Sequence, residues 1–211
     1  MTGEARGKFI VLEGLDGSGK TSLLGTLGAK LAELGVRYRE EREPTDGALG
    51  TLARDAVKKK LCLETESLAL LFAADRYEHV TGVVLPALAQ GIHVLCDRFV
   101  FSNVAYQGLS MSMEEIIGYN RAAIEKCMPD LTVFVDVSPA ECVRRMNASR
   151  TLRELYDEVG ERLRSNYLSA LELLGEKNRL LIVDGNGEPE QVWQRIWAAV
   201  EPVLLSTGAC K

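Results

Sequence analysis

The chain has 211 residues, which is enough for one domain with a substantial core. Apolar residues make up 46% and charged residues 26%, as in ordinary soluble globular proteins, and the net charge of -5 argues against a broad nucleic-acid-binding surface. No apolar run is long enough to span a membrane, and the first residues, MTGEARGK, lack the apolar core of a signal peptide. We therefore expect a cytoplasmic protein without nucleic-acid or membrane partners.

Five short runs, separated by longer helical patterns, predict the strands of a sheet. In chain order they are KFIVLE (8–13), VRYREE (36–41), IHVLCD (92–97), LTVFVDV (131–137) and RLLIVD (179–184). Four of the five are continuously apolar, which is typical of parallel strands covered by helices on both faces.

Helical patterns fill the intervals between these strands. They lie near residues 19–34, 48–60, 64–90, 113–127, 139–148, 152–175 and 188–205, with a further short helix around 102–107. The alternation predicts an α/β fold of three layers, in which a five-stranded parallel sheet is flanked by helices joined through right-handed crossovers. No linker or repeat divides the sequence, so we expect a single domain over residues 1–211.

Ligands of such sheets bind beyond the carboxyl ends of the strands. Polar residues follow the predicted strands at Glu13 to Lys20, Glu41 to Pro44, Asp97-Arg98 and Asp136. These separated stretches are therefore expected to meet at one edge of the sheet.

The stretch GLDGSGKT (14–21) fits the phosphate-loop pattern G-x-x-x-x-G-K-[ST], between an apolar strand and an amphipathic helix. Backbone N–H groups of such a loop, with the N-terminus of the helix, hold nucleotide phosphates. Lys20 is expected to reach the β- and γ-phosphates, and Thr21 to ligate Mg²⁺. The predicted ATP-binding residues are Gly14, Leu15, Asp16, Gly17, Ser18, Gly19, Lys20, Thr21 and Ser22.

The phosphate loop alone does not distinguish a GTPase switch, an ATP-driven motor and a small-molecule kinase, because all three classes of protein contain it. The N-K-x-D string that reads guanine in GTPases is missing from the sequence, and the length leaves little room for a motor. Asp16 is unusual inside the loop of a simple switch, although a solvated turn aspartate is an alternative.

Three further stretches are candidates for the acceptor side. Arg42 leaves the second strand, and Pro44 restricts the chain beside it, so a bidentate phosphate contact is possible there. Asp97 ends the third strand, where a Walker B carboxylate would lie near Mg²⁺, and Arg98 follows it. A surface arginine in a charged loop is the alternative for Arg42.

Base-reading side chains are expected on two helices. Asn103 and Tyr106 share one helical face, with Ser102 and Gln107 beside them, and can read a base edge and a sugar. Phe72 and Arg76 are also helical neighbours, suited to stack on and hydrogen-bond a planar base. The alternative for Asn103 is a helix-capping residue. The alternative for Phe72 and Arg76 is a core phenylalanine beside a surface arginine.

Taken together, the sequence resembles the thymidylate kinase family, whose members phosphorylate dTMP with ATP. The matching strings are GLDGSGKT, REPT, FAADRYEHV, DRFVFSNVAYQG, VDVSPAECVRR and VDGNGEPEQV, in the family's order over most of the chain. The resemblance implies a P-loop NTPase fold with a small helical lid at about 146–158, the cofactors ATP and Mg²⁺, and a homodimer.

The resemblance also implies a role for each matching position. Asp16, Arg42 and Arg98 would grip the dTMP phosphate, with Pro44 and, less securely, Arg54 nearby. On the base, Phe72 would stack on thymine, Arg76 would bond its 4-carbonyl, Asn103 would read the pyrimidine edge near Ser102 and Gln107, and Tyr106 would favour the deoxy sugar. Arg145 would lie along adenine, and the loop 184–188 with Gly185 would close the adenine pocket.

Family members differ in where their catalytic arginine lies. Some carry it in the phosphate loop, at the position of Gly17 here, and others supply it from the lid. The lid stretch SRTLRELYDE contains Arg150 and Arg153, and the sequence does not choose between them. Two departures from the family pattern are REPT for REPG, which affects the loop near the acceptor phosphate, and Phe99 for tyrosine, which is expected to matter little. The alternative functions are a UMP- or CMP-type kinase and, more distantly, a nucleotide-dependent switch.

Overall fold

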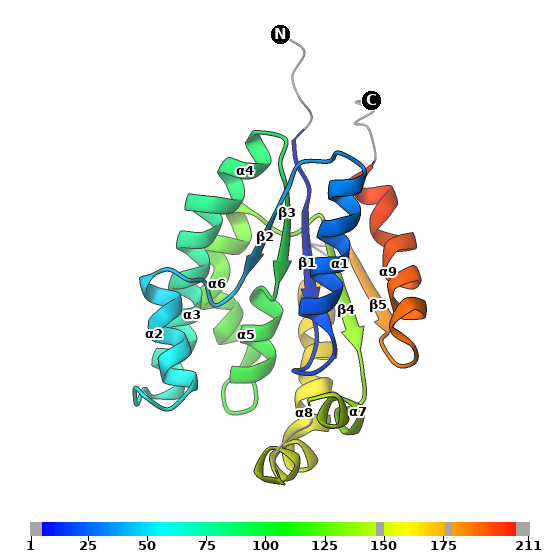
Figure 1. Cartoon of the computed structure of the whole chain (residues 1–211). Coiled ribbons are helices and arrows are strands. Elements are labelled where there is room, and N and C mark those ends of the chain that lie inside the picture. Colours follow the sequence, from blue (N-terminus) through cyan, green and yellow to red (C-terminus); the bar gives the residue numbers. More distant parts are fainter. Residues whose placement is uncertain (1–5, 147–149, 176–178, 206–211) are drawn as a thin grey trace.

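Five parallel strands form one sheet at the centre of the molecule (Figure 1). The computed structural model describes the backbone of residues 6–146, 150–175 and 179–205, and their side chains except those of residues 150–158. The strands are β1 (Phe9–Glu13), β2 (Tyr38–Arg42), β3 (His93–Asp97), β4 (Leu131–Asp136) and β5 (Leu180–Asp184), in the order β2-β3-β1-β4-β5. All five predicted strands, and their parallel arrangement, are confirmed.

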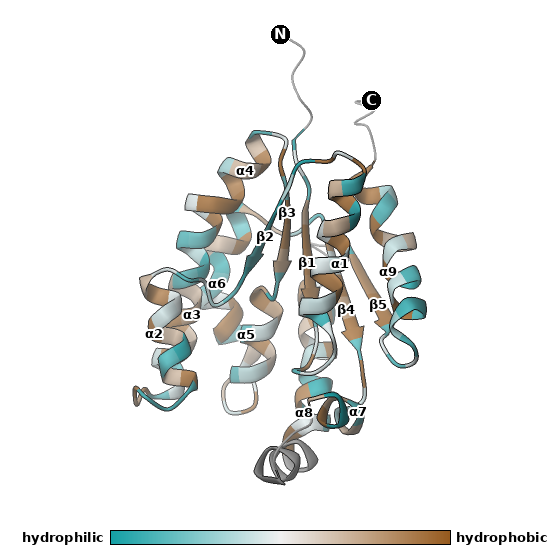
Figure 2. Ribbon diagram, in the orientation of Figure 1, coloured by the Kyte–Doolittle hydropathy of each residue, from teal (hydrophilic) through white to brown (hydrophobic). Residues whose placement is uncertain are grey.

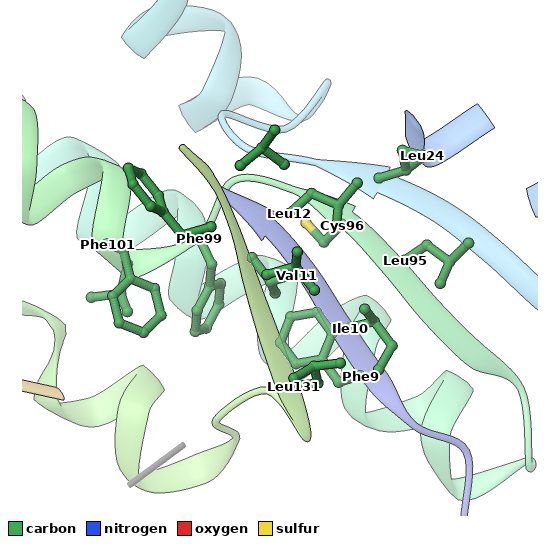
Figure 3. Close-up of a cluster of buried hydrophobic side chains, with 14 of the residues drawn as sticks. Phe9, Ile10, Val11, Leu12, Leu24, Leu95, Cys96, Phe99, Phe101 and Leu131 are labelled. Atoms are coloured by element: carbon green, nitrogen blue, oxygen red, sulfur yellow. The ribbon is translucent and has the colours of Figure 1, made fainter. Parts of the chain in front are cut away.

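The central strand β1 explains why this order is stable. All five of its residues are buried, and its neighbours β3 and β4 are also apolar (Figure 2). Figure 3 shows Phe9, Val11 and Leu131 within a cluster that reaches Phe99 and Phe101, beyond the end of β3. The rings of Phe9 and Phe99 meet edge to face, with centroids 5.3 Å apart, so the segment after β3 is fixed to the sheet core.

Helices cover both faces of the sheet. The helix α1 contacts β1, β2 and β3, and α9 contacts β4 and β5; Figure 1 shows both in front of the strands. The described helices are α1 (Lys20–Glu33), α2 (Ala48–Val57), α3 (Thr65–His79), α4 (Leu85–Ala89), α5 (Val100–Gln107), α6 (Met113–Lys126), α7 (Pro139–Arg145), α8 (Arg150–Gly175) and α9 (Pro189–Leu204). None of the helices in the described ranges is long and apolar enough to cross a membrane.

Two details differ from the sequence-based expectation. The apolar run of β5 predicts a strand covered on both faces, but β5 is an edge strand and Ile182 is 50% exposed. The single helix expected over 64–90 is divided by the π-helical segment η1 (Val80–Val84). Pro86 follows it, and because proline lacks an N–H and crowds the preceding turn, a wider turn there relieves the clash.

Strand register brings the polar stretches together at the carboxyl edge. Asp97 lies beside Leu12 of β1 on one side and beside Arg42 of β2 on the other. The phosphate loop, the residues after β2 and the residues after β3 therefore start from adjacent points, at the end of the molecule where α7 and α8 lie (Figure 1).

Candidate active site

The loop between β1 and α1 has the backbone of a phosphate-binding loop. Gly14, Gly17 and Gly19 have φ values of 148°, 84° and 95°, in the region that favours glycine. The Lys20 ammonium donates to the carbonyls of Gly14 (2.9 Å) and Leu15 (2.8 Å), so it is held across the loop. Burial, together with the charge of Arg98, lowers the pKa of Lys20 to about 8.

Helix α7 closes one side of this loop. A Cβ at Gly17 would lie 2.5 Å from the Cys142 carbonyl oxygen, so the loop and α7 touch at this point. Arg145, in the last turn of α7, donates to the carbonyls of Ser18 (3.4 Å) and Gly185 (2.9 Å). Arg145 therefore connects the phosphate loop to the loop after β5.

A large cleft lies over the phosphate loop. Its volume is about 820 Å³, and its walls include residues 16–22, Arg145, and Gly187 to Glu190 at the start of α9. Gly185 does not line the cleft directly; its carbonyl accepts from Arg145. The aromatic side chain of Trp193, which the sequence analysis did not single out, also lines it.

The residues predicted to ligate Mg²⁺ lie together. The Thr21 hydroxyl donates to Asp97 Oδ2 at 2.7 Å, and Asp97 Oδ1 is buried without a protein hydrogen-bond partner. A buried carboxylate oxygen needs a partner, and carboxylate and hydroxyl oxygens suit Mg²⁺, which binds through few protein ligands and keeps several waters. The donor set therefore fits the ion.

Arg98 is the centre of the polar network next to the loop. One nitrogen, Nη1, donates to Ser102 Oγ (2.8 Å) and Tyr167 Oη (2.7 Å), while Nη2 pairs with Asp16 Oδ1 at 2.5 Å. The Tyr106 hydroxyl donates to the other oxygen of Asp16 at 3.1 Å. Burial acts to raise the pKa of Asp16, but the charges of Arg98 and Lys20 outweigh it and lower that pKa. Asp16 is therefore a carboxylate oriented toward Arg98.

Two residues of this network were not predicted as site residues. Glu13 is fully buried and accepts from the backbone of Phe99 (2.7 Å) and the hydroxyl of Ser102 (2.6 Å), so it fixes the start of α5. Burial raises the pKa of Glu13. Tyr167 comes from α8, and only the folded chain places it beside Arg98. Glu13 does belong to a polar stretch at the strand end, which is a usable sequence signal.

A smaller cavity of about 210 Å³ lies between α3 and α5. Its walls include the predicted base-reading residues Phe72, Arg76, Ser102, Asn103, Tyr106 and Gln107, together with Pro44. Asn103 donates to Gln107 Oε1 at 3.0 Å, and its own oxygen accepts from Arg76 at 3.2 Å. The structure thus brings side chains from two helices and the loop after β2 around one small space.

The other predicted arginines of the acceptor side lie on or near the loop after β2. Arg42 is exposed, pairs with Asp46 at 2.6 Å and lines the large cleft. Arg54 donates to the carbonyls of Pro44 (2.8 Å) and Thr45, and so fixes the loop that contains the cis peptide bond between Glu43 and Pro44.

The predicted lid arginines cannot be placed. Residues 147–149, and the side chains of Arg150 and Arg153, lie outside the described part of the protein. The backbone of residues 150–158 is helical and forms the start of α8.

Asp16, Glu43 and Arg98 line both the large cleft and the small cavity, so the two spaces meet at these residues. A comparison with protein families agrees with this geometry: the family described as thymidylate kinase matches residues 12–196. The chain belongs to the thymidylate kinase family. It is 38% identical to a probable thymidylate kinase of Pyrococcus abyssi over 95% of this chain and 98% of that protein. Similar proteins named thymidylate kinase occur in Synechococcus sp. (36% identical, 94% of this chain and 97% of that protein) and Bacillus cereus (33%, 95% and 100%).

Proposed function

We propose that the protein transfers the γ-phosphoryl group of ATP to the phosphate of dTMP, forming dTDP for dTTP synthesis. The observation that carries this proposal is the meeting of the two cavities at Asp16 and Arg98. The large cleft has a phosphate loop, as a donor site needs, and the small cavity has the size and side chains for a pyrimidine. The arrangement fits the activity of the thymidylate kinase family.

On the donor side, Gly14 to Ser22 would hold the phosphates, and Arg145 with the loop 184–188 would enclose the adenine. Thr21 and Asp97 would hold Mg²⁺, which when bound supplies positive charge to the phosphate oxygens. Lys20 already lies across the loop, so little movement is needed for it to reach the β- and γ-phosphates.

On the acceptor side, Arg98 and Arg42 would hold the attacking phosphate in line with the donor, and Asp16 orients Arg98. In the small cavity, Phe72 would stack on the base, while Arg76, Asn103 and Gln107 read its polar edge. Tyr106 would lie against the sugar, with Ser102, Pro44 and Arg54 supporting the walls. The attacking phosphate is already ionised, so positioning and charge suffice and a strong general base is unnecessary.

Binding measurements test the acceptor assignment. Isothermal titration of dTMP, dUMP, UMP, CMP and AMP is expected to give the tightest binding for dTMP. Tighter binding of a ribonucleotide would favour a UMP- or CMP-type kinase. The absence of dTMP binding, together with slow ATP hydrolysis independent of any acceptor, would favour a nucleotide-dependent switch.

We also propose that the chain forms one domain, works in the cytoplasm and assembles as a homodimer. The exposed apolar side chains of Leu70 (46% exposed) and Tyr77 (36% exposed), which lie seven residues apart on α3, support a dimer face there. Light scattering is expected to give twice the monomer mass for the wild type and the monomer mass for Leu70→Glu. A monomeric wild type at micromolar concentration would contradict the dimer.

A further inference from the structure

A buried cluster of charged side chains lies behind the small cavity. His79, at the end of α3, pairs with Glu43 through Nδ1 (2.9 Å) and with Glu41 through Nε2 (3.4 Å). The second oxygen of Glu43 pairs with Nε of Arg76 at 2.8 Å. The side chains of His79, Glu43 and Arg76 are 1%, 3% and 2% exposed, so all three are removed from water.

Contacts in this cluster connect His79 to Glu43 and Glu43 to Arg76, which lines the small cavity. Each carboxylate oxygen of Glu43 is ion-paired inside the protein, Oε1 with His79 and Oε2 with Arg76. Arg76 also donates to Asn103 (3.2 Å), Asn120 and the Phe99 carbonyl (3.1 Å). A guanidinium has five N–H groups. Three of them make these hydrogen bonds, and Nε faces Glu43 only as an ion pair. One N–H on Nη2 is left, at a residue that lines the cavity.

Further hydrogen bonds hold α3 against the loop after β2, and this loop against β3. The Asp75 carboxylate accepts from the backbone N–H (2.8 Å) and the hydroxyl (2.5 Å) of Thr45, and the N–H of Glu43 donates to the Asp97 carbonyl at 3.0 Å. Arg42 lies between Glu41 and Glu43. The cluster therefore links the residue proposed to hold the acceptor phosphate with the residue proposed to read its base.

We propose that His79 and Glu43 are positioning residues of the acceptor site, which fix the guanidinium of Arg76 in the orientation that recognises the carbonyl edge of the base. This inference rests on the proposed function, because it assigns the cavity to the acceptor. It explains why the Glu43 carboxylate and the His79 imidazole are buried together beside Arg76.

The charge balance of the cluster supports this role. Burial acts to lower the pKa of His79, but its hydrogen bonds to the Glu41 and Glu43 carboxylates and the charges of these groups outweigh burial and raise that pKa to about 9. At neutral pH the imidazolium and the Arg76 guanidinium thus face the two glutamates. A neutral residue at position 79 would leave Arg76 as the charged partner of Glu43, while Glu41 keeps Arg39. The lost positive charge beside Glu43 favours a changed position of the Arg76 guanidinium.

His79→Gln tests the proposal, with His93→Gln as the matched control. His93, the other histidine, begins β3 at the opposite end of the sheet, where its Nδ1 accepts from the Lys8 N–H at 2.9 Å. We expect His79→Gln to raise KM for dTMP roughly tenfold, with KM for ATP and kcat within about threefold of wild type. His93→Gln is expected to keep the wild-type values. Equal increases in both KM values, or an unchanged KM for dTMP in folded His79→Gln, would overturn the proposal.

Glu43→Asp provides a second test that does not depend on the folding of His79→Gln. It keeps the charge but shortens the side chain, so one carboxylate can no longer reach both His79 and Arg76. We expect the same selective rise in KM for dTMP, and a lower ratio of kcat/KM for dTMP over dCMP, whose base has an amino group in place of the 4-carbonyl. If Arg76 mediates the effect, adding His79→Gln to Glu43→Asp changes the ratio little further.

Measurements on the wild type distinguish a failure of the proposed function from a failure of this inference. Wild-type protein that neither binds nor phosphorylates dTMP would overturn the proposed function. Wild-type protein that prefers dTMP to dCMP, while folded Glu43→Asp keeps the same preference and KM, would overturn this inference alone.

Discussion

Arg98 has an unusual backbone conformation, with a φ of 75° where a non-glycine residue is rarely found. The surrounding contacts hold it there: Ser102 and Tyr167 bind one nitrogen of the guanidinium, and Asp16 binds the other. Side chains held in such conformations cluster at functional sites, because the strain fixes the group in one direction. In this protein the direction is toward the junction of the two cavities.

Arg98→Ala therefore tests the assignment of the acceptor phosphate. We expect kcat/KM for dTMP to fall about 10²- to 10³-fold, because the attacking phosphate loses its charged partner inside the site. The fold is expected to persist, since Ser102 and Tyr167 still contact each other at 2.9 Å. Steady-state kinetics and a thermal melt check both statements, with the exposed Arg121 of α6 changed to alanine as the control. Near-normal turnover in folded Arg98→Ala would refute the role.

His79 predicts a pH dependence of stability. Its pKa is about 9 in the folded protein and about 6.5 when unfolded, so its contribution is complete below pH 6.5 and is lost as pH rises through 9. The pKa difference corresponds to about 3 kcal/mol. Urea unfolding at about pH 6 and about pH 10 is expected to show His79→Gln losing most of its stability difference from wild type at the higher pH. A difference independent of pH would contradict the raised pKa.

At the level of elements, the phosphate loop contacts α7 at Gly17. Gly17→Ala introduces a Cβ against the Cys142 carbonyl and keeps an unfavourable φ, so we expect a loss of about 2 kcal/mol. Gly25→Ala, in open space on α1, is the control and is expected to gain up to about 1 kcal/mol. Thermal melts measure both; a Gly17→Ala protein as stable as wild type would contradict the contact.

The start of α8 then becomes the expected source of the catalytic arginine. We predict that either Arg150→Ala or Arg153→Ala lowers kcat at least about a hundredfold, with little change in KM for dTMP. Arg162→Ala, an exposed position on the same helix that donates to the Leu109 carbonyl, is the control. Single-turnover kinetics distinguish a slower chemical step from slower product release. Normal rates in both lid variants would require another source of positive charge.

Local patterns were sufficient for most elements and for the loop that binds phosphates. The apolar run ending at Glu13 and the spacing of Gly14, Gly19 and Lys20 are local signals, and the structure places them as predicted. The exposure of β5 was not predictable, because strand order and not strand composition sets which strands lie at the edges. The contacts of Tyr167 and His79 were also not predictable, because their partners lie far away in sequence. His79 lies in the matching string FAADRYEHV, but that string gave it no role.

At the scale of the whole molecule, the order of the strands organises the site. The crossover that places β1 between β3 and β4 brings the phosphate loop beside Asp97 and Arg98, and β2 delivers Arg42 and Glu43 on the far side of β3. Donor and acceptor spaces therefore share one border. A protein with a donor cleft alone would hydrolyse its nucleotide or switch state, whereas two joined cavities favour transfer between bound substrates.

The central claim is transfer of phosphate from ATP to dTMP, and the most direct measurement is ADP release coupled to a spectrophotometric signal. With ATP and Mg²⁺ present, we predict that dTMP accelerates ADP release strongly, that dTDP forms in equal amount, and that UMP, CMP and AMP give far lower kcat/KM. A rate unaffected by dTMP, or a higher kcat/KM for any ribonucleotide, would contradict the account.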